Sequence, residues 1–183
     1  MAENQSVQHW VNEVARMCRP DEVVWCDGSE AEHERLLETA VRVGDLMPLD
    51  QRALPGCYLH RSASTDVART EHLTFICSRE QADAGPTNNW MDPKEAYAKL
   101  SDIYRGLMKG RTMYVVPYLM GPVGSPHSKV GVELTDSVYV ALNMQIMTRM
   151  GNVALEALGS DGVFVKGLHS IGNLDPAKRY ICH

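Results

Sequence analysis

Arg69 is a side chain whose chemistry suits the binding of a carboxylate. It lies in the segment Asp66-Val-Ala-Arg-Thr-Glu71, between two acidic residues. A guanidinium group is planar, keeps its charge at physiological pH and can donate two parallel hydrogen bonds to one carboxylate. The same segment also fits a surface arginine that pairs with Asp66 or Glu71, and the residues alone favour that structural role.

Three further basic residues, Arg111, Lys129 and Arg149, could bind an anion directly. Basic side chains also neutralise nearby acids and bond to the carbonyl groups left open at the ends of helices. For all three we expect pairing with Glu133, with Asp136 or with such carbonyl groups, rather than contact with a ligand.

Two histidines, His127 and His169, have the chemistry of a general base. A lone histidine is usually a hydrogen-bonded structural residue, and we expect that role for both. The loop 121–126 is rich in glycine and proline, but it does not fit the phosphate-binding pattern G-x-x-x-x-G-K followed by Ser or Thr. We expect it to fix the shape of a turn. The segment 88–90, Asn-Asn-Trp, predicts a turn with a packing anchor.

The cysteines predict free thiols rather than a metal site. They are Cys18, Cys26, Cys57, Cys77 and Cys182. An odd, widely spaced set without a signal-peptide pattern is typical of a reducing compartment. The pairs Cys57-x-x-His60 and Cys182-His183 are half-sites for zinc that no second pair completes. We expect no metal ligand, catalytic residue or cofactor-binding residue in this chain.

The stretch 109–136 organises the elements that must position these side chains. An apolar run, 113–120, predicts a buried strand, and 130–134 predicts a second one after the rigid loop. Thr135-Asp136-Ser137 offers an N-cap for an apolar helix, 138–150, that we expect to be buried on most sides, with its methionines (Met144, Met147 and Met150) as core filler. Strand, loop, strand and helix indicate an α/β fold, a mixed sheet flanked by helices.

The rest of the chain supplies further helices and strands. Helices are predicted at 7–18 after Ser6 as N-cap, at 29–44 with Ser29 and Glu32 as a capping box, at 92–110 with Asp92 as N-cap and Gly110 at its end, and at 152–159 with Asn152 as cap. Short strands are predicted at 22–26, 57–60, 73–77 and 163–168.

Composition narrows the class of protein. The chain has 183 residues, which fits one large domain or part of a larger protein. The net charge is -5 and the 18 Lys and Arg residues are scattered, which argues against nucleic acid or an anionic membrane as the main partner. No apolar run reaches the length of about 18 residues that a membrane span needs.

Several long, rare sequence words stand in order along nearly the whole chain. They are WCDGS (25–29), DVAR (66–69), GPTNNWMDP (85–93), GRTMYVVP (110–117), MGPVGSP (120–126), GVELTDS (131–137), IMTRMG (146–151), LEALG (155–159) and LHSIG (168–172). In this combination the chain resembles the N-terminal region of GTP-dependent phosphoenolpyruvate carboxykinase.

The resemblance implies a reaction and a role for two residues. The family interconverts oxaloacetate and GTP with phosphoenolpyruvate, GDP and carbon dioxide in gluconeogenesis, through an enolate and phosphoryl transfer. In this family the arginine that matches Arg69 binds the carboxylate of oxaloacetate or phosphoenolpyruvate. The acid that matches Glu71 contacts a mobile lid.

The resemblance also implies what this chain lacks. The family's phosphate loop, guanine pocket and Mn²⁺ ligands fall in a C-terminal part beyond the matching words. We therefore expect residues 1–183 to be a truncated N-terminal domain of a cytoplasmic enzyme, inactive alone, whose parent binds GTP and Mn²⁺ or Mg²⁺. The alternatives are a non-catalytic module that still binds organic acids, and an interaction remnant without a ligand.

Overall fold

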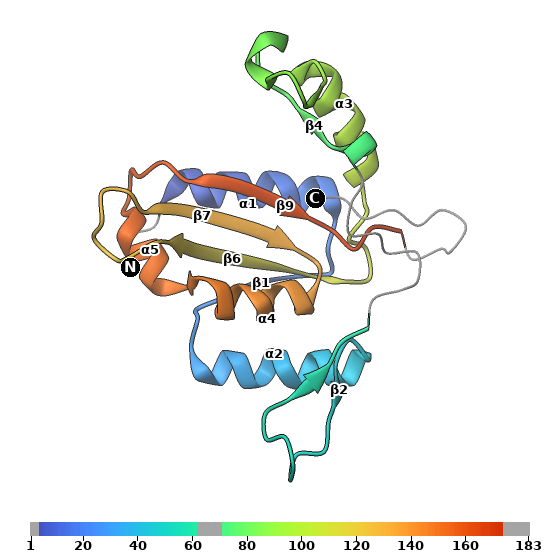
Figure 1. The fold of residues 1–183 in the computed structure, drawn as a ribbon, viewed down its shortest axis with the longest axis vertical. Coiled ribbons are helices and arrows are strands. Elements are labelled where there is room, and N and C mark those ends of the chain that lie inside the picture. The colour runs from blue at the N-terminus through green and yellow to red at the C-terminus, as the bar shows by residue number, and fades with distance from the viewer. Residues whose placement is uncertain (1–3, 62–70, 174–183) are drawn as a thin grey trace. The chain divides into compact units, whose positions relative to one another are not determined.

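Strand β6 (Thr112–Met120) is the element around which the computed structural model of this chain is built. It is the longest strand and is buried along most of its length. The structure describes residues 4–61 and 71–173, and they divide into two units (Figure 1). One unit falls within Met1–His60 and Gly106–His183, and the other within Arg61–Arg105.

The larger unit holds the main sheet. Its strands are β1 (Glu22–Trp25), β6, β7 (Lys129–Thr135), β8 (Arg149–Met150) and β9 (Val165–His169), with a separate hairpin of β2 (Met47–Pro48) and β3 (Tyr58–Leu59). Its helices are α1 (Gln5–Cys18), α2 (Glu30–Val43), α4 (Val138–Met147) and α5 (Asn152–Leu158).

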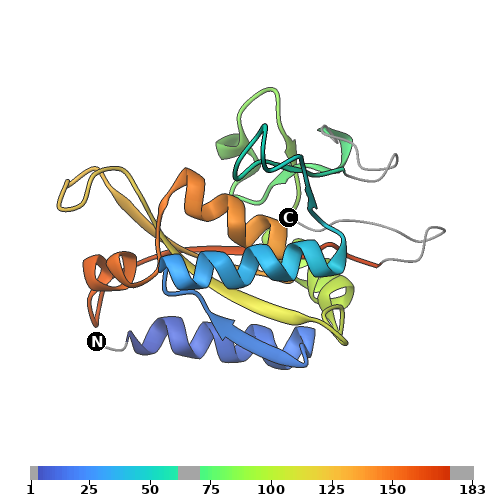
Figure 2. The same ribbon diagram turned by 90° about the horizontal axis from the view of Figure 1, so that it is seen from below.

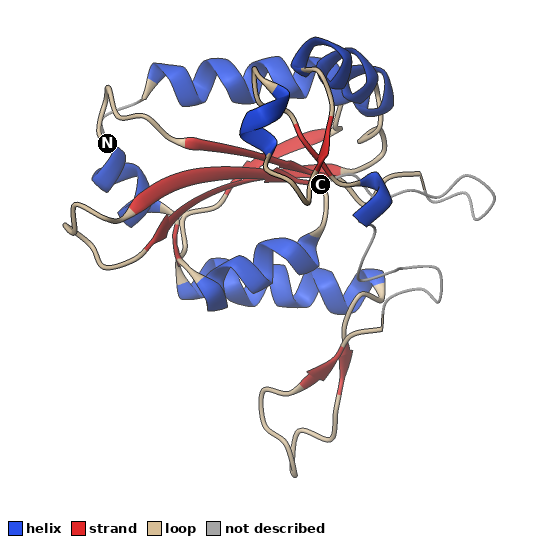
Figure 3. Ribbon diagram, turned by 45° about the horizontal axis from the view of Figure 1, so that its top comes forward, coloured by secondary structure: helices blue, strands red, loops and turns tan. Residues whose placement is uncertain are grey.

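The sheet is mixed, as the sequence predicted. Strand order is β1-β6-β7-β9, and β8 also pairs with β6. The β1–β6 and β7–β9 pairs are parallel, whereas β6–β7 and β6–β8 are antiparallel. Helix α1 lies on one side of the sheet and α2 and α4 lie on the other (Figures 2 and 3). The predicted α/β fold with flanking helices is therefore confirmed.

Pro117 lies inside β6, where a proline would normally remove a ladder hydrogen bond. Strand β1 ends opposite Val115 and β8 begins opposite Tyr118, so Pro117 falls in the gap between these two neighbours. The Pro117 carbonyl still accepts a hydrogen bond from the Gly151 amide at 2.8 Å. The missing N–H of Pro117 therefore lies where neither β1 nor β8 would accept a hydrogen bond from it.

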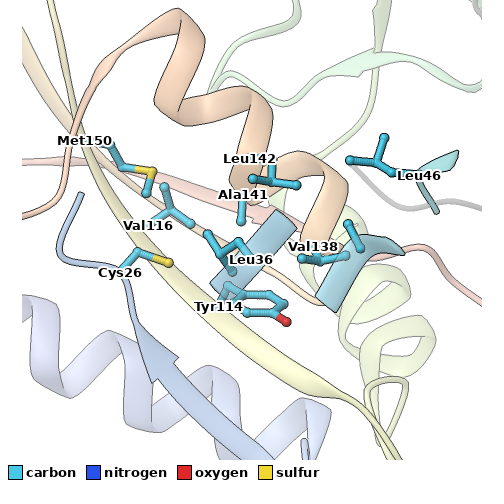
Figure 4. Packing of buried hydrophobic residues seen from close by; sticks show 10 residues of the cluster. Cys26, Leu36, Leu46, Tyr114, Val116, Val138, Ala141, Leu142 and Met150 are labelled. Atoms are coloured by element: carbon cyan, nitrogen blue, oxygen red, sulfur yellow. The ribbon is translucent and has the colours of Figure 1, made fainter. Parts of the chain in front are cut away.

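The core on the α2–α4 side joins both helices to the middle of the sheet (Figure 4). Its buried members are Cys26, Leu36, Ala40, Leu46, Tyr114, Val116, Val138, Ala141, Leu142 and Met150. Burying a leucine or valine side chain contributes about 1.5–3 kcal/mol. These contacts hold α4 over β6 and so fix the loop that joins β7 to α4.

The smaller unit contains short elements. They are η1 (Glu71–Leu73), β4 (Phe75–Ile76), η2 (Gln81–Ala84), β5 (Asn89–Trp90) and α3 (Pro93–Tyr104). Strands β4 and β5 pair in parallel. The predicted strand 73–77 is shorter than expected because the 3₁₀ turn η1 includes its first residue.

Helix α4 differs from its prediction in length and burial. It ends at Met147 instead of Met150, because residues 149–150 pair with β6 as β8. Its expected burial on most sides is also wrong, since Ile146 is 79% exposed and Met147 65% exposed. Of its predicted filler methionines, Met144 packs against the core and Met147 does not.

Helix α3 ends at Tyr104, six residues before the predicted end at Gly110 (110 − 104 = 6). The chain beyond it bonds to the end of α1 instead of continuing as a helix. The Gly106 amide donates to the Met17 carbonyl at 2.8 Å, and the Met108 amide donates to the Cys18 carbonyl at 3.0 Å. These bonds satisfy carbonyl groups that the end of a helix leaves open.

Two of the predicted helix N-caps depend only on residues close to them in the sequence. Ser29 and Asp92 cap α2 and α3 as predicted, with bonds to the Glu32 amide at 3.1 Å and the Lys94 amide at 2.8 Å. The Glu32 carboxylate accepts from the Gly28 amide, one residue before the cap.

Two predicted caps are wrong. Asn4, not Ser6, caps α1, and its side chain accepts from the Ser6 and Val7 amides. Gly151, not Asn152, precedes α5. Strand β9 also starts two residues later than predicted, at Val165 (165 − 163 = 2).

Asn4 supplies a test of the corrected cap. Its side-chain amide also donates to the carbonyls of Gly159 and Gly162, at 3.1 and 3.2 Å. Asn4→Ala should therefore lower the free energy of unfolding by about 2 kcal/mol, because a cap and two further bonds are lost. Ser6→Ala is the matched control and should change it by less than about 0.5 kcal/mol. Urea denaturation of both variants measures the difference, and equal midpoints would contradict the assignment.

Candidate functional site

Arg69, the predicted substrate-binding residue, lies outside the described residues. Glu71 is the first described residue after it and begins η1. The Glu71 side chain is exposed. Within residues 4–61 and 71–173 its carboxylate has no hydrogen-bond or ion-pair partner. The carboxylate that is predicted to contact the lid is therefore exposed to solvent.

Asn89 holds the backbone at Glu71. Its side-chain amide donates to the Glu71 carbonyl at 2.7 Å and to the Thr74 carbonyl at 3.1 Å. Trp90, the next residue, donates from its indole nitrogen to the Ser78 carbonyl at 3.0 Å. Asn89 and Trp90 thus form strand β5 instead of the predicted turn, and the Asn89 side chain fixes the backbone two positions after Arg69 (71 − 69 = 2).

Arg111 is a structural residue, as expected. Its guanidinium pairs with the fully buried carboxylate of Asp136 at 3.1 Å and donates to the Gly172 carbonyl at 3.0 Å and to the Leu107 carbonyl. Asp136 also accepts from the Ser170 hydroxyl at 2.8 Å. This network joins the start of β6 to the ends of β7 and β9.

The other basic residues and the loop between β6 and β7 also have structural roles or face solvent. Arg149 donates to the Gly121 carbonyl at 3.0 Å, as predicted, and Lys129 is exposed at the start of β7. Gly121 has φ of 99°, and a side chain there would meet Ser128. The Ser128 hydroxyl donates to the Pro122 carbonyl at 2.6 Å. The loop is therefore shaped by its own backbone, as the sequence indicated.

His169 is buried and its Nδ1 lies 2.7 Å from the Thr135 hydroxyl. The predicted structural role is confirmed for this residue. His127 is exposed in the loop before β7, and its backbone amide donates to the Ser125 hydroxyl at 3.3 Å.

Cysteines and acids of the described residues form no metal centre. No three of their His, Cys, Asp and Glu side chains lie close enough to bind one ion. Cys18 and Cys26 are buried free thiols, and Cys57 and Cys77 are exposed ones. Burial raises the pKa of the Cys26 thiol, with a further contribution from the nearby Glu32 carboxylate. Cys182 and His183 lie outside the described residues.

A hollow of about 340 Å³ opens between α4, β7 and β9. It is lined by Glu133, Val140, Gly167, Leu168 and His169. Burial raises the pKa of the Glu133 carboxyl to about 7. Burial, and then the negative charge of Glu133, raise the pKa of Tyr118.

Two glycines make room for these side chains. Glu133 pairs in register with Gly167 on β9, and a Cβ atom at 167 would overlap the Glu133 carboxylate. Tyr118 pairs with Gly131 on β7, and a Cβ atom at 131 would overlap its ring. Both side chains therefore lie flat over the neighbouring strand.

The sequence did not single out Glu133 as a site residue, since we expected it to neutralise a basic residue. Arg111 instead pairs with Asp136, and the Glu133 carboxylate pairs with none of the described residues. The relation of Glu133 to Gly167 is visible only in the structure, where the register of β7 and β9 places the two residues opposite each other.

Comparison with known proteins identifies the family. Residues 9–183 match the model described as the phosphoenolpyruvate carboxykinase N-terminal domain. The chain belongs to this family. It is similar to proteins named phosphoenolpyruvate carboxykinase (GTP): 61% identical over 180 residues to that of Anaeromyxobacter sp. (strain K), and 52% identical over 169 residues to that of Corynebacterium jeikeium (strain K411).

The carboxykinase relatives are much longer than this chain. The first alignment covers 98% of the chain and 30% of the relative, and the second covers 92% and 28%. A relative from Chlamydia trachomatis serovar D is 50% identical over 169 residues, which are 92% of the chain and 28% of that protein. The chain thus spans about 30% of the length of its curated relatives. Among the described residues, no helix is long and apolar enough to cross a membrane.

Glu133 predicts a pH dependence of stability for this carboxykinase domain. Its folded pKa, about 7, lies above the unfolded value of 4.5. The folded state therefore binds more protons between these values, and the free energy of unfolding falls as pH rises from about 4.5 through 7. At 1.36 kcal/mol per pKa unit the loss is on the order of 3 kcal/mol.

The Glu133→Gln chain should lack this contribution and be more stable than the wild type at pH 8. Urea denaturation at pH 5 and pH 8 measures it. Glu34→Gln, at an exposed position on α2, is the control and should follow the wild type. A Glu133→Gln chain with an unchanged pH profile would show that this carboxylate is ionised in the folded state without cost.

Proposed function

We propose that this chain is the substrate-binding N-terminal portion of a GTP-dependent phosphoenolpyruvate carboxykinase. That enzyme converts oxaloacetate and GTP into phosphoenolpyruvate, GDP and carbon dioxide, a carboxy-lyase reaction of gluconeogenesis that we place in the cytoplasm. The observation that carries the proposal is the 61% identity, over 98% of the chain, to a protein with that name.

Arg69 holds the carboxylate of the organic acid in this proposal. A charge-assisted pair of hydrogen bonds fixes the acid in position before any bond breaks. Glu71 contacts the lid that closes over the substrate, and a closed lid excludes water. The exposed side chain of Glu71 and its anchored backbone fit a residue that meets a moving partner.

Manganese or magnesium and GTP belong to the rest of the enzyme. The described residues lack a convergent set of metal-ligating side chains, so this part of the chain does not fit a metal ion. The loop 121–126 is shaped by internal bonds and does not fit a phosphate cradle. We assign no step of phosphoryl transfer to the residues described above.

Alone, the 183-residue chain is inactive in this proposal. A charged hydrogen-bonded grip contributes about 1.5–3 kcal/mol, whereas a dissociation constant of even 1 mM requires about 4 kcal/mol. One arginine therefore cannot hold the substrate by itself. The rival function is a non-catalytic module that binds organic acids, and measurable binding of phosphoenolpyruvate by the isolated chain would favour it.

Arg69→Ala in the full-length carboxykinase tests the proposed role directly. The KM for oxaloacetate should rise roughly 10- to 100-fold, because 1.4 kcal/mol corresponds to a factor of ten. Affinity for GTP should stay unchanged, since Arg69 binds the organic acid only. Arg79→Ala, at an exposed position of the same unit, is the control. Unchanged oxaloacetate kinetics in the Arg69 variant would place the carboxylate elsewhere.

Asn89→Ala tests whether the backbone anchor supports that site. Two hydrogen bonds to the Glu71 and Thr74 carbonyls are lost, each contributing about 1 kcal/mol. We expect the KM for oxaloacetate in the full-length enzyme to rise by up to about tenfold, again without an effect on GTP affinity.

Asn88→Ala is the matched control for this anchor. Asn88 donates to the Ala84 carbonyl at 2.7 Å, away from Glu71. Steady-state kinetics of both variants decides the matter, and equal effects would mean that the anchor only stabilises the fold.

A further inference from the structure

Glu133 is a half-buried carboxylate to which the described part of the larger unit supplies no partner. It lines the hollow between α4, β7 and β9, and no hydrogen bond or ion pair reaches it from residues 4–61 or 71–173. Taking a carboxylate out of water without a partner lowers stability. The fold does not use this charge, because Arg111 pairs with Asp136 instead. A group that is costly to the fold and lies in a hollow is a candidate for ligand binding.

The register of β7 and β9 makes room for this carboxylate. Gly167 stands opposite Glu133, and a Cβ atom at 167 would overlap the carboxylate oxygen Oε2. Gly167 does not have a positive φ, so its backbone angle does not require a glycine. The glycine therefore serves to leave space, and the Glu133 head group lies across β9 in that space.

The rest of the hollow suits a small, partly apolar ligand. Its volume of about 340 Å³ falls in the range of small-molecule pockets, about 300–1,000 Å³. Val140 lines it from α4, and His169 lines it from the end of β9. Val165 lies on the same side of β9 as Gly167, two positions before it, and is 55% exposed. One acid beside valine side chains matches a ligand with a cationic head and a flat apolar body.

We propose that this hollow binds a small organic cation, an amidinium or guanidinium joined to an aromatic or short aliphatic group, and that Glu133 pairs with its head group. Such a planar head donates two parallel hydrogen bonds to one carboxylate, while the attached group packs on Val140 and Val165. A metal ion fits less well, because the described residues hold no group of three metal-ligating side chains. This cation site is independent of Arg69, which we assigned to an organic anion.

The first test is calorimetric titration of benzamidine, an aromatic amidinium, into the full-length carboxykinase and into the 183-residue chain at pH 8. Glu133→Gln should weaken binding at least about tenfold, because the charged partner is lost. Glu34→Gln, at an exposed position on α2, is the matched control and should bind like the wild type. Benzamide, which has the same ring without the charge, should bind about tenfold more weakly than benzamidine.

Three outcomes of this titration would overturn the proposal. They are the absence of benzamidine binding at millimolar concentration, equal affinity of the wild type and Glu133→Gln, and binding to the 183-residue chain but not to the full-length carboxykinase. In the last case the hollow would be an internal surface of the enzyme.

The second test uses pH to identify the group that binds the probe. Burial raises the pKa of the Glu133 carboxyl to about 7, so this group is mostly ionised at pH 8 and protonated at pH 5. The ionised fraction falls about tenfold for each pH unit below the pKa, and benzamidine, which keeps its charge, should bind roughly 100-fold more weakly at pH 5. In Glu133→Gln the affinity should not change with pH.

Other titratable groups on this side of the sheet are Tyr118 on β6, opposite Gly131, and His169 on β9. Helix α4 carries no charged side chain. Tyr118 stays neutral over this range, since burial raises its pKa. A histidine gains positive charge near pH 6.5 or about there, and would repel the probe. A fall in affinity that persists in Glu133→Gln would therefore assign the pH dependence to His169 and contradict the role of Glu133.

Gly167→Ala tests the geometry while the charge is kept. A methyl group at 167 takes the space of the Glu133 head group, so benzamidine should bind about tenfold more weakly at pH 8. Unchanged affinity in a folded Gly167→Ala chain would reduce the site to a non-specific attraction between charges. Urea midpoints report whether each variant folds, and Glu133→Gln decides the question if Gly167→Ala does not. Arg69→Ala should leave benzamidine binding unchanged, which separates this site from the proposed organic-acid site.

Discussion

The buried pair of Asp136 and Arg111 is the interaction on which the larger unit depends. Asp136 stands just after β7, Arg111 just before β6, and the Asp136 carboxylate also accepts from Ser170 and Ile171 after β9. Removing either partner of such a pair leaves an unpaired buried charge, at a cost of about 3–5 kcal/mol. One carboxylate therefore sets where three strands begin or end and where α4 starts.

This arrangement explains why the loop after β7 is so regular. The Thr135 hydroxyl accepts from the Ser137 amide at 3.0 Å and lies 2.7 Å from the ring of His169. Ser137 then caps α4 through the Val140 amide. Thr135, Asp136 and Ser137 thus contact the first turn of α4, β9 with the residues after it, and Arg111 before β6. Their burial is tolerated because each has partners.

Local sequence signals predicted much of this fold, and contacts between distant residues account for the errors. Ser29 and Asp92 were predictable as caps because their partners lie within three residues. Asn4 was not, because its side chain also bonds to Gly159 and Gly162, more than 150 residues away. The early end of α3 has the same cause, since its following amides bond to α1.

The residues of the candidate site also differ in whether the sequence alone could identify them. Arg69 could be proposed from the sequence, because the residues that identify its motif are adjacent to it in the chain. Glu133 could not, because its meaning depends on Gly167 lying opposite in a parallel strand pair and on the absence of a partner among the described residues. Periodicity places both residues in strands, but it does not give the register between them.

Glu133 and Asp136 stand three residues apart and meet opposite conditions. Asp136 is enclosed by donors from the same unit, so its charge is part of the internal structure. Glu133 lines a hollow with Val140 and Gly167, and burial raises its pKa. A folded protein seldom keeps a half-buried acid without a donor. The two acids thus differ in whether the described residues of the larger unit supply hydrogen-bond donors to them.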